Sequence, residues 1–364
     1  MAVGKIGYPV EFVEDVFGES SALADIIKGI SEGRPARILI VADMNVVNRT
    51  PGLGAKIGRY VNAHDIQLAT NPVVISGGEK AKSENLQSVM KVISGMLEAR
   101  LTKDDCVLAI GGGSILDVVG YAAAQVRGGM KVVRIPTTPS AMLGSAFANF
   151  AAVDYLSVKD ALRVASQPAG VLVDISFAKT VMDGVWRSGF CEAMRLAAVS
   201  DASFLKNLAK LAVGYRERDM AVFAQVVEGS WATRQKKGPS TFGSWATARL
   251  ESMSGYRLPY GYALAIGLCV DLDYAVAKGI LAEKDKAFIR DVLAQSGALD
   301  LMINSRHLLN QVENVLLGLD AWSLCPTSVG IEMPAGLGKR HLETEPDRDV
   351  YRKVFQEFFV ATGA

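Results

Sequence analysis

Three successive glycines at positions 111–113, followed by Ser114, constrain the fold of this chain more than any other feature. An apolar, strand-like segment at 106–110 precedes them, and a helix-like segment at 115–126 follows. Glycine lets the backbone approach an anion closely, and the first N–H groups of a helix supply donors and the positive end of the helix dipole. The pattern therefore predicts a strand–turn–helix unit that holds the pyrophosphate of a dinucleotide.

Strand-like and helix-like segments alternate through the first half of the chain. Short apolar runs predict buried strands, and apolar residues at helical spacing predict helices between them. This alternation predicts an α/β fold with a doubly wound, parallel, Rossmann-like sheet. Ligands on such sheets bind beyond the carboxyl ends of the strands, where Asp43, Gly111 and Thr137 lie. The expected strands are 38–41, 72–75, 106–110, 132–135 and 171–173, and the expected helices are 83–100, capped by Ser83, and 115–126.

From about residue 177 onward, strand patterns mostly vanish and long apolar-periodic segments dominate. We therefore predict two domains, a dinucleotide-binding α/β domain over 1–176 and a mostly helical domain over 177–364. The helices of the second domain are expected at 189–213, 220–234, 246–253, 262–277 and 285–295.

Composition excludes several classes of protein. The net charge of +1 over 364 residues gives no electrostatic case for binding nucleic acid or an anionic membrane. The longest apolar stretch, 262–277, contains Asp271 and Asp273 and is too short to span a bilayer. The N-terminus has no signal-peptide core, so we expect a cytoplasmic protein. Its scattered cysteines are expected to be reduced core residues: Cys106, Cys191, Cys269 and Cys325.

The chain resembles the dehydroquinate synthase family, and more broadly the sugar phosphate cyclases, which are relatives of the iron-dependent alcohol dehydrogenases. The resemblance covers nearly the whole chain. It implies the fold of that family, NAD as cofactor, a small-molecule substrate and a homodimer. Five blocks carry it in the expected order: Tyr8 to Val10, Gly78 to Ser83, Gly111 to Asp117, Ile135 to Thr138 and Gly189 to Ala193.

The cofactor side of the family pattern is intact. Asp43 and Asn45 match the positions at the adenosine end of the cofactor. A carboxylate there accepts hydrogen bonds from the ribose hydroxyls and repels a 2′-phosphate, so NAD is expected rather than NADP. The alternative is that these two residues cap a turn and that Glu79 and Lys82 are solvated. The further matches are the ribose pair Glu79 and Lys82, the pyrophosphate cradle Gly112, Gly113 and Ser114, the nicotinamide-side carboxylate Asp117, and the contacts Thr137, Thr138, Lys159 and Thr180.

The metal side of the family pattern is lost. In the family, a glutamate and two histidines hold a divalent metal. Glu192 occupies the glutamate position, but Ser244 and Tyr260 stand at the histidine positions. A neutral hydroxyl and a neutral phenol bind divalent ions poorly, so we expect no metal.

The substrate pocket also differs from the family pattern. Gly144 and Phe150 replace an acid and a lysine, whereas Arg195 keeps the charge of a lysine and Lys237 stands for an arginine. A less cationic and more apolar pocket does not suit heptulosonate phosphate. The expected aromatic lining is Phe150, Trp245, Tyr260 and Tyr262.

The candidate catalytic residues are Glu192, Lys159, Tyr260, Arg195 and Lys237. Glu192 suits general acid–base duty, Tyr260 suits donation to a carbonyl, and Lys159 suits the role of a base. Plainer alternatives remain. Glu192 pairs with Arg195 on one helix face, Tyr260 packs with its hydroxyl on a backbone group, and Lys237 is simply solvated.

Two hypotheses of function follow. The first is an NAD-dependent, metal-independent enzyme that acts on a different substrate in a specialised biosynthetic pathway. The second is a non-catalytic NAD-binding homologue that serves as a partner or regulatory subunit. A third, a polyol or alcohol dehydrogenase, shares the glycine run, but those enzymes also need histidines in the second domain.

Overall fold

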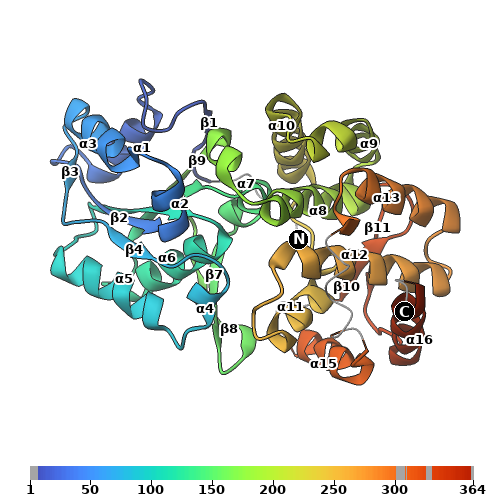
Figure 1. Ribbon diagram of the computed structural model, residues 1–364. Coiled ribbons are helices and arrows are strands. Elements are labelled where there is room, and N and C mark those ends of the chain that lie inside the picture. Colours follow the sequence, from blue (N-terminus) through green and yellow to red (C-terminus); the bar gives the residue numbers. More distant parts are fainter. Residues whose placement is uncertain (1–6, 301–307, 309, 325–329, 362–364) are drawn as a thin grey trace. The chain divides into compact units, whose positions relative to one another are not determined.

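The computed structural model describes residues 7–300, 308, 310–324 and 330–361. The chain divides into an α/β unit that ends at Val181 and a helical unit that begins at Met182 (Figure 1). The boundary expected from the sequence, after residue 176, falls inside the 3-10 helix η2 (Ile175–Thr180).

A parallel sheet is the core of the α/β unit (Figure 1). All residues of β5 (Cys106–Gly111) are buried, as are all but the first residue of β2 (Arg37–Asp43), because helices cover both faces of the sheet. The α/β class and the strands expected from the apolar runs are confirmed. In the described part of the chain the strand order is β1 (Val10–Val13), β9 (Gly170–Asp174), β6 (Lys131–Pro136), β5 (Cys106–Gly111), β2 (Arg37–Asp43) and β3 (Gln67–Leu68), and β4 (Val73–Ile75) pairs with the second half of β2.

Helices α1 (Ala22–Ser31) and α3 (Leu53–Ala63) lie on one side of the sheet, and α5 (Gln87–Glu98) lies on the other (Figure 1). The helix expected over 83–100 is present as α5, but its expected start and its Ser83 cap are wrong, because Ser83 is the last residue of α4 (Lys80–Ser83). The chain passes through positive φ at Asn85 (45°) and Leu86 (66°), which separates α4 from α5. The other helices of this unit are α2 (Met44–Arg49), α4 (Lys80–Ser83), α6 (Gly113–Gln125), α7 (Pro139–Leu143) and η1 (Ser145–Phe147).

An antiparallel hairpin that the sequence did not predict packs on α6. Its strands are β7 (Phe150–Tyr155) and β8 (Val158–Ala165). Leu156 and Ser157 form the turn with φ of 49° and 63°, as in a type I′ turn, but neither is a residue that favours this conformation. The turn therefore lacks the usual sequence signature.

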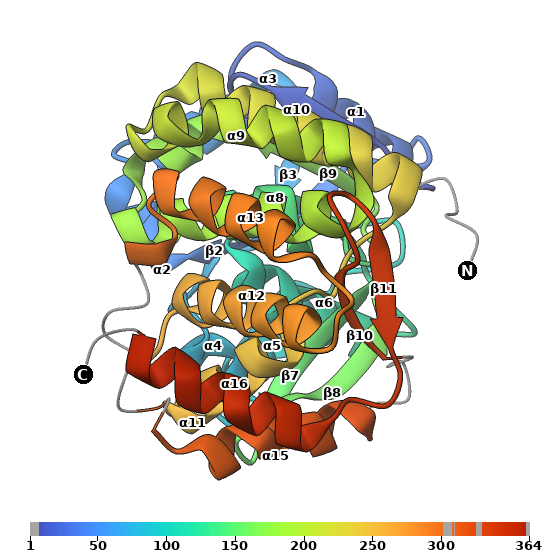
Figure 2. The ribbon, with the colours of Figure 1, turned by 90° about the vertical axis from the view of Figure 1, so that its right-hand side faces the viewer.

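Helix α12 (Tyr260–Ala277) is the centre of the helical unit. It packs on α8 (Asp183–Ser200) and α11 (Ser244–Met253), and it lies between α13 (Glu283–Gln295) and α16 (Arg348–Ala361) in Figure 2. The predicted helices are confirmed, except that 189–213 is two helices, the second capped by Asp201. The remaining elements are α9 (Ala202–Arg216), α10 (Met220–Lys237), α15 (Val312–Ser323), β10 (Ile331–Pro334) and β11 (Arg340–Glu343).

Helix α12 is also long and apolar enough to cross a membrane by length and composition, yet 72% of it is buried inside the structure. Core helices of soluble proteins have the same properties. Among the cysteines, Cys106, Cys191 and Cys269 are buried and free, and Cys325 lies outside the described residues.

Asp271 is a fully buried acid that joins three helices of this unit. Its carboxylate accepts hydrogen bonds from Gly243 N (3.0 Å), Trp245 Nε1 (2.8 Å) and Tyr351 OH (2.9 Å). Burial raises the pKa of Asp271 to about 7, although the three donors lower it. Trp245 is 1% exposed. It is a core residue, and the expectation that it lines a pocket is wrong.

Candidate functional site

The glycine run lies where β5 ends and α6 begins, with Gly112 as the N-cap of α6. A Cβ on Gly112 would lie 3.0 Å from Thr138 Cγ2, and one on Gly113 would lie 2.7 Å from Ser145 Oγ. The glycines therefore let this turn pack closely on the segment that follows β6. The first N–H groups of an α-helix have no acceptor within the helix. The start of α6 can therefore donate hydrogen bonds to an anion.

Thr137 follows β6 directly, and its backbone N–H donates to Gly111 O (3.0 Å). Its side chain is 2% exposed, and its hydroxyl oxygen has no hydrogen-bond partner among the described residues. A buried, unsatisfied polar group costs about 1–3 kcal/mol. A ligand bound beside the glycine run would recover this energy. Thr138 differs, because its hydroxyl caps α7 by accepting from Ala141 N (3.4 Å).

Asp43 is the last residue of β2 and the N-cap of α2. Its Oδ1 accepts from Asn45 N (2.8 Å) and Asn45 Nδ2 (3.1 Å), so the capping alternative is realised. A Cβ on Gly77 would lie 2.1 Å from Asp43 Oδ2, so the missing side chain at Gly77 makes room for this carboxylate. Burial raises the pKa of Asp43, and the bonds from Asn45 lower it. Oδ2 lies against Gly77, in the loop that follows β4.

Lys82 joins carboxylates from three elements. Its Nζ lies 3.0 Å from Asp117 Oδ2, 2.7 Å from Asp160 Oδ1 and 3.6 Å from Glu79 Oε1. The Lys82 side chain is only 5% exposed, so the alternative in which it is solvated is wrong. Burial alone would lower the pKa of Lys82, but the surrounding aspartates hold it well above its ordinary value.

Glu79 is held from two sides. Ser114 Oγ donates to its Oε2 (2.9 Å), and Lys159 Nζ contacts its Oε1. The structure thus brings together five residues that the family pattern singled out from separate parts of the chain: Glu79, Lys82, Ser114, Asp117 and Lys159.

Two acids that the sequence reasoning missed complete this network. Asp160 N donates to Asp154 Oδ1 (2.8 Å), and both residues lie on the β7–β8 hairpin. Burial raises the pKa of Asp154 to about 6. For Asp160, burial is outweighed by Lys82 and Lys159, which hold its pKa below the ordinary value. Neither acid stands in a recognisable motif, and only the hairpin brings them to Lys82.

Thr180 is the last residue of η2 and is exposed. Its hydroxyl donates to Phe177 O (3.3 Å), and its carbonyl accepts from Arg49 (3.2 Å). Lys237, the last residue of α10, is exposed as well.

Four side chains from α8, α11 and α12 meet in the helical unit, and we call them the Arg195 cluster: Glu192, Arg195, Ser244 and Tyr260. Tyr260 OH donates to Glu192 Oε1, and Arg195 Nη1 lies 3.5 Å from the same oxygen. Arg195 Nη2 donates to Ser244 Oγ (3.1 Å). The ion pair between Glu192 and Arg195 is therefore present. The alternative that places the Tyr260 hydroxyl on a backbone group is wrong.

The protonation states in this cluster follow from its charges. Burial raises the pKa of Tyr260 well above its ordinary value, and the nearby Glu192 adds to the shift although Arg195 opposes it. Burial lowers the pKa of Arg195, but Glu192 and Tyr260 more than offset this effect. Tyr260 is therefore a hydrogen-bond donor near neutral pH, and Arg195 is a permanent cation.

Glu332 of β10 fixes the loop that leads into α11, and no sequence pattern singled it out. Its Oε2 accepts from Ser240 Oγ (2.9 Å) and Thr241 N (2.8 Å), and its Oε1 pairs with Arg340 (3.2 Å). The next residue of that loop, Phe242, accepts from Arg195 Nε through its carbonyl (3.0 Å). Glu332 thus positions the backbone that holds Arg195.

The side chains that the Arg195 cluster offers as metal ligands do not suit a divalent metal ion. They comprise one carboxylate, one hydroxyl and one phenol, and a guanidinium lies against two of them. Over residues 7–300, 308, 310–324 and 330–361, no three His, Cys, Asp or Glu side chains gather so as to hold a metal ion.

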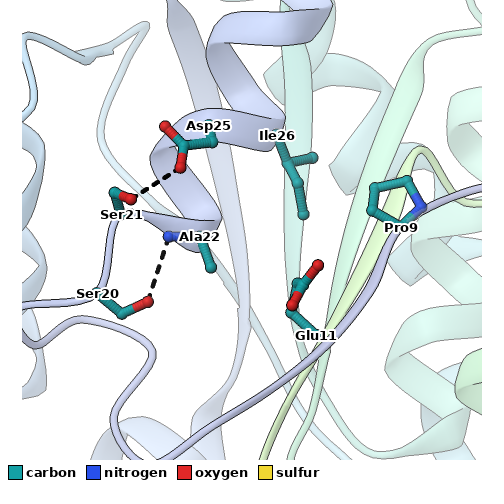
Figure 3. Close-up of a pocket in the computed structure, with 7 residues that line it drawn as sticks. All are labelled: Pro9, Glu11, Ser20, Ser21, Ala22, Asp25 and Ile26. Carbon is teal, nitrogen blue, oxygen red and sulfur yellow. Dashed lines mark hydrogen bonds between the residues drawn. The ribbon is translucent and has the colours of Figure 1, made fainter.

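A separate pocket of about 490 Å³ lies between β1 and α1 (Figure 3). Ser21 Oγ donates to Asp25 Oδ2 (2.8 Å), and Glu11 adds a second carboxylate, so the lining is acidic and does not suit a phosphate. None of the predicted site residues lines it. The lining residues are Pro9, Glu11, Ser20, Ser21, Ala22, Asp25 and Ile26.

Known proteins share parts of this sequence. The family model of the 3-dehydroquinate synthase N-terminal domain matches residues 72–188. The 3-dehydroquinate synthase of Pyrobaculum islandicum is 34% identical over 155 residues, which cover 43% of this chain and 45% of that protein. The demethyl-4-deoxygadusol synthase of Trichormus variabilis is 30% identical over 207 residues, which cover 57% of this chain and 48% of the relative. The chain thus spans about half the length of these curated relatives.

A solved structure agrees over the whole chain. The 2-epi-5-epi-valiolone synthase of Streptomyces hygroscopicus, determined with NAD+ and Zn2+ bound, superposes with a TM-score of 0.81 at 22% identity and covers 99% of each chain. The shared fold and the matched segment, which contains the glycine run, agree with the resemblance found in the sequence. The chain therefore has the fold of the dehydroquinate synthase-like proteins, and its residues 72–188 match the N-terminal domain of 3-dehydroquinate synthase.

Proposed function

We propose that this chain is an NAD-dependent, metal-independent enzyme of the sugar phosphate cyclase type. Its substrate is a small molecule other than heptulosonate phosphate, used in a specialised biosynthetic pathway. The observation that carries the cofactor assignment is the Thr137 hydroxyl, which is buried and unpartnered among the described residues at the carboxyl end of β6. Such strand ends are where ligands bind on doubly wound sheets.

The α/β unit supplies the cofactor contacts in this proposal. The start of α6 holds the pyrophosphate, Asp43 Oδ2 accepts a ribose hydroxyl, and Thr137 bonds the cofactor. When bound, NAD+ supplies an acceptor for a hydride. The bound NAD+ of the valiolone synthase structure supports this assignment.

The helical unit supplies the substrate groups. Oxidation of a secondary alcohol moves a hydride from carbon and a proton from oxygen. Glu192, the acceptor of the Arg195 cluster, is our candidate for receiving that proton. Tyr260 does not suit the role of base, because its pKa lies well above the ordinary value. It instead donates to the substrate oxygen. Lys159 is assigned to holding Glu79.

Turnover tests the enzymatic part of the proposal. The protein is incubated with NAD and a panel of polyols and cyclitol precursors. We expect at least one of them to yield NADH, or a cyclised product detected by mass spectrometry. Glu192→Gln should lose this turnover. Heptulosonate phosphate should give none. Efficient turnover of heptulosonate phosphate would contradict the changed substrate.

One observation favours a non-catalytic homologue as the second candidate function. Glu192 is already engaged by both Tyr260 and Arg195, so the cluster needs no substrate to satisfy it. A protein that binds NAD but reduces it with no member of the panel would support this candidate, a partner or regulatory subunit.

The proposal also includes a cytoplasmic homodimer, as the family resemblance implies. Sedimentation equilibrium should give the mass of two chains, and the mass of a single chain would contradict the dimer.

A further inference from the structure

We propose that the guanidinium of Arg195 takes the place of the divalent metal ion in this chain and is the cation that meets the substrate oxygen. The inference rests on the metal-independent part of the proposed function. It starts from the disagreement between the expected metal position and the residues that fill it.

The positions that match the metal ligands do converge in this structure. Glu192 lies within α8, and Ser244 and Tyr260 are the first residues of α11 and α12. Arg195 contacts two of these three side chains directly, and the third, Tyr260, shares the oxygen Glu192 Oε1 with it. The cation is therefore at the centre of the set.

Hydrogen bonds within the helical unit hold the guanidinium of Arg195 in place. Its Nε donates to Phe242 O (3.0 Å), its Nη2 donates to Ser244 Oγ (3.1 Å), and its side chain is 12% exposed. A planar fork reaches these two acceptors and the carboxylate together, which the point charge of a lysine ammonium does not do. Arginine at this position is thus a specific choice.

The same arrangement excludes a metal ion. A guanidinium stays protonated in proteins, and Arg195 Nη1 lies 3.5 Å from Glu192 Oε1. A divalent cation entering among these side chains would face this charge at short range. Glu192 is the one carboxylate of the set, and Arg195 already neutralises it.

The arrangement also leaves donors for a ligand. Phe242 O and Ser244 Oγ take two of the five N–H groups that a guanidinium carries. Nη1 and the phenol of Tyr260 both point to Glu192 Oε1. An oxygen of the substrate, either a carbonyl or a developing alkoxide, would bond the same two donors in place of a metal.

Cobalt binding tests the inference, because tetrahedral Co2+ has visible absorption bands that need no turnover. We expect EDTA-treated wild type, titrated with Co2+, to show no such bands. The triple variant Arg195→Lys, Ser244→His, Tyr260→His removes the guanidinium and restores two imidazole ligands beside Glu192. It should take up one equivalent of Co2+ with tetrahedral bands. Adding Glu192→Gln to the triple variant is the matched control and should abolish the bands.

The Co2+ titration of wild type and that of the triple variant can each overturn the inference. One equivalent of Co2+ bound by wild type, and lost in Glu192→Gln, would show that the guanidinium does not fill the metal's place. A triple variant that keeps its circular dichroism and its cooperative thermal melting but binds no Co2+ would show that the ligand positions do not form such a site. The wild-type arm is decisive if the triple variant does not fold. NAD enters neither cobalt readout, so failure of the cofactor assignment stays distinguishable.

Discussion

Substitution of Thr137 should affect the stability of the protein and its affinity for NAD in opposite directions. Thr137→Val keeps the shape of the side chain and removes a buried hydroxyl that lacks a partner among the described residues. Without NAD, the variant should be at least as stable as wild type, by about 0–1 kcal/mol in the free energy of unfolding. With NAD, one hydrogen bond is lost, so affinity should fall roughly tenfold. Thermal melting and calorimetry measure the two effects.

The neighbouring threonine is the control for this substitution. Thr138→Val removes the cap of α7, so it should lower stability by about 1 kcal/mol without NAD. A Thr137→Val protein that is clearly destabilised yet binds NAD normally would mean that this hydroxyl serves the fold and not a ligand.

Asp271 predicts a pH dependence of stability. Its pKa is about 7 in the folded chain, against an ordinary value of 3.8. Between about pH 4 and about pH 7 the folded state therefore holds a proton that the unfolded state has lost, so the free energy of unfolding falls as the pH rises. Asn cannot ionise. We compare the free energy of unfolding of Asp271→Asn with that of wild type by urea titration. Relative to wild type, the variant should gain roughly 2 kcal/mol in this free energy between about pH 5 and about pH 8.

An exposed acid offers the comparison for Asp271. Asp65→Asn makes the same substitution at an exposed position, and its pH series is the baseline against which the Asp271→Asn series is compared. If Asp271→Asn shows a constant difference at all pH values, Asp271 is ionised throughout and its three donors outweigh burial.

At the scale of elements, the turn of the β7–β8 hairpin is strained. Leu156 and Ser157 adopt positive φ, and Leu156 is 74% exposed. The double variant Leu156→Asn, Ser157→Gly places the preferred pair of a type I′ turn there and should raise stability by about 1 kcal/mol. Thermal melting measures the gain. Ser157→Ala, which keeps the strain, should give none, and a double variant no more stable than wild type would contradict the turn assignment.

The central strands of the parallel sheet could be predicted from sequence because both of their faces are buried, whereas β1 and β3, which have no buried residue, were missed. That burial makes β2 and β5 continuous apolar runs, such as Ile38 to Val41. The β7–β8 hairpin could not be predicted, because its turn has no Asn or Gly. The break between α4 and α5 was missed for a similar reason, since Leu86 at positive φ fits a helical pattern in the sequence.

The candidate site divides in the same way. Family blocks identified Lys82 and Asp117, which the structure joins at 3.0 Å. Asp160 and Glu332 were missed because each reaches the site on a hairpin strand, where its role depends on tertiary pairing. The hydrogen bond between Arg195 and Ser244 likewise depends on how α8 and α11 are placed in space.

At the scale of the whole molecule, the two units carry different parts of the account. The α/β unit has the glycine run at the end of a strand and the Thr137 hydroxyl, which has no hydrogen-bond partner among the described residues, and we propose that these groups hold the dinucleotide. In the helical unit, a guanidinium lies among the residues at the metal-ligand positions. Both observations support our proposal that this chain uses NAD without a metal ion.

Calorimetric titration of NAD into EDTA-treated protein tests this central claim most directly. Gly113→Asp places a carboxylate at the start of α6, where even a Cβ would lie 2.7 Å from Ser145 Oγ. Gly54→Asp makes the same change in an open position at the start of α3. The account predicts saturable binding of one NAD per chain for wild type and Gly54→Asp, none for Gly113→Asp, and no change on adding Zn2+. Binding that is absent from the EDTA-treated wild type, or that appears only with Zn2+, would contradict it.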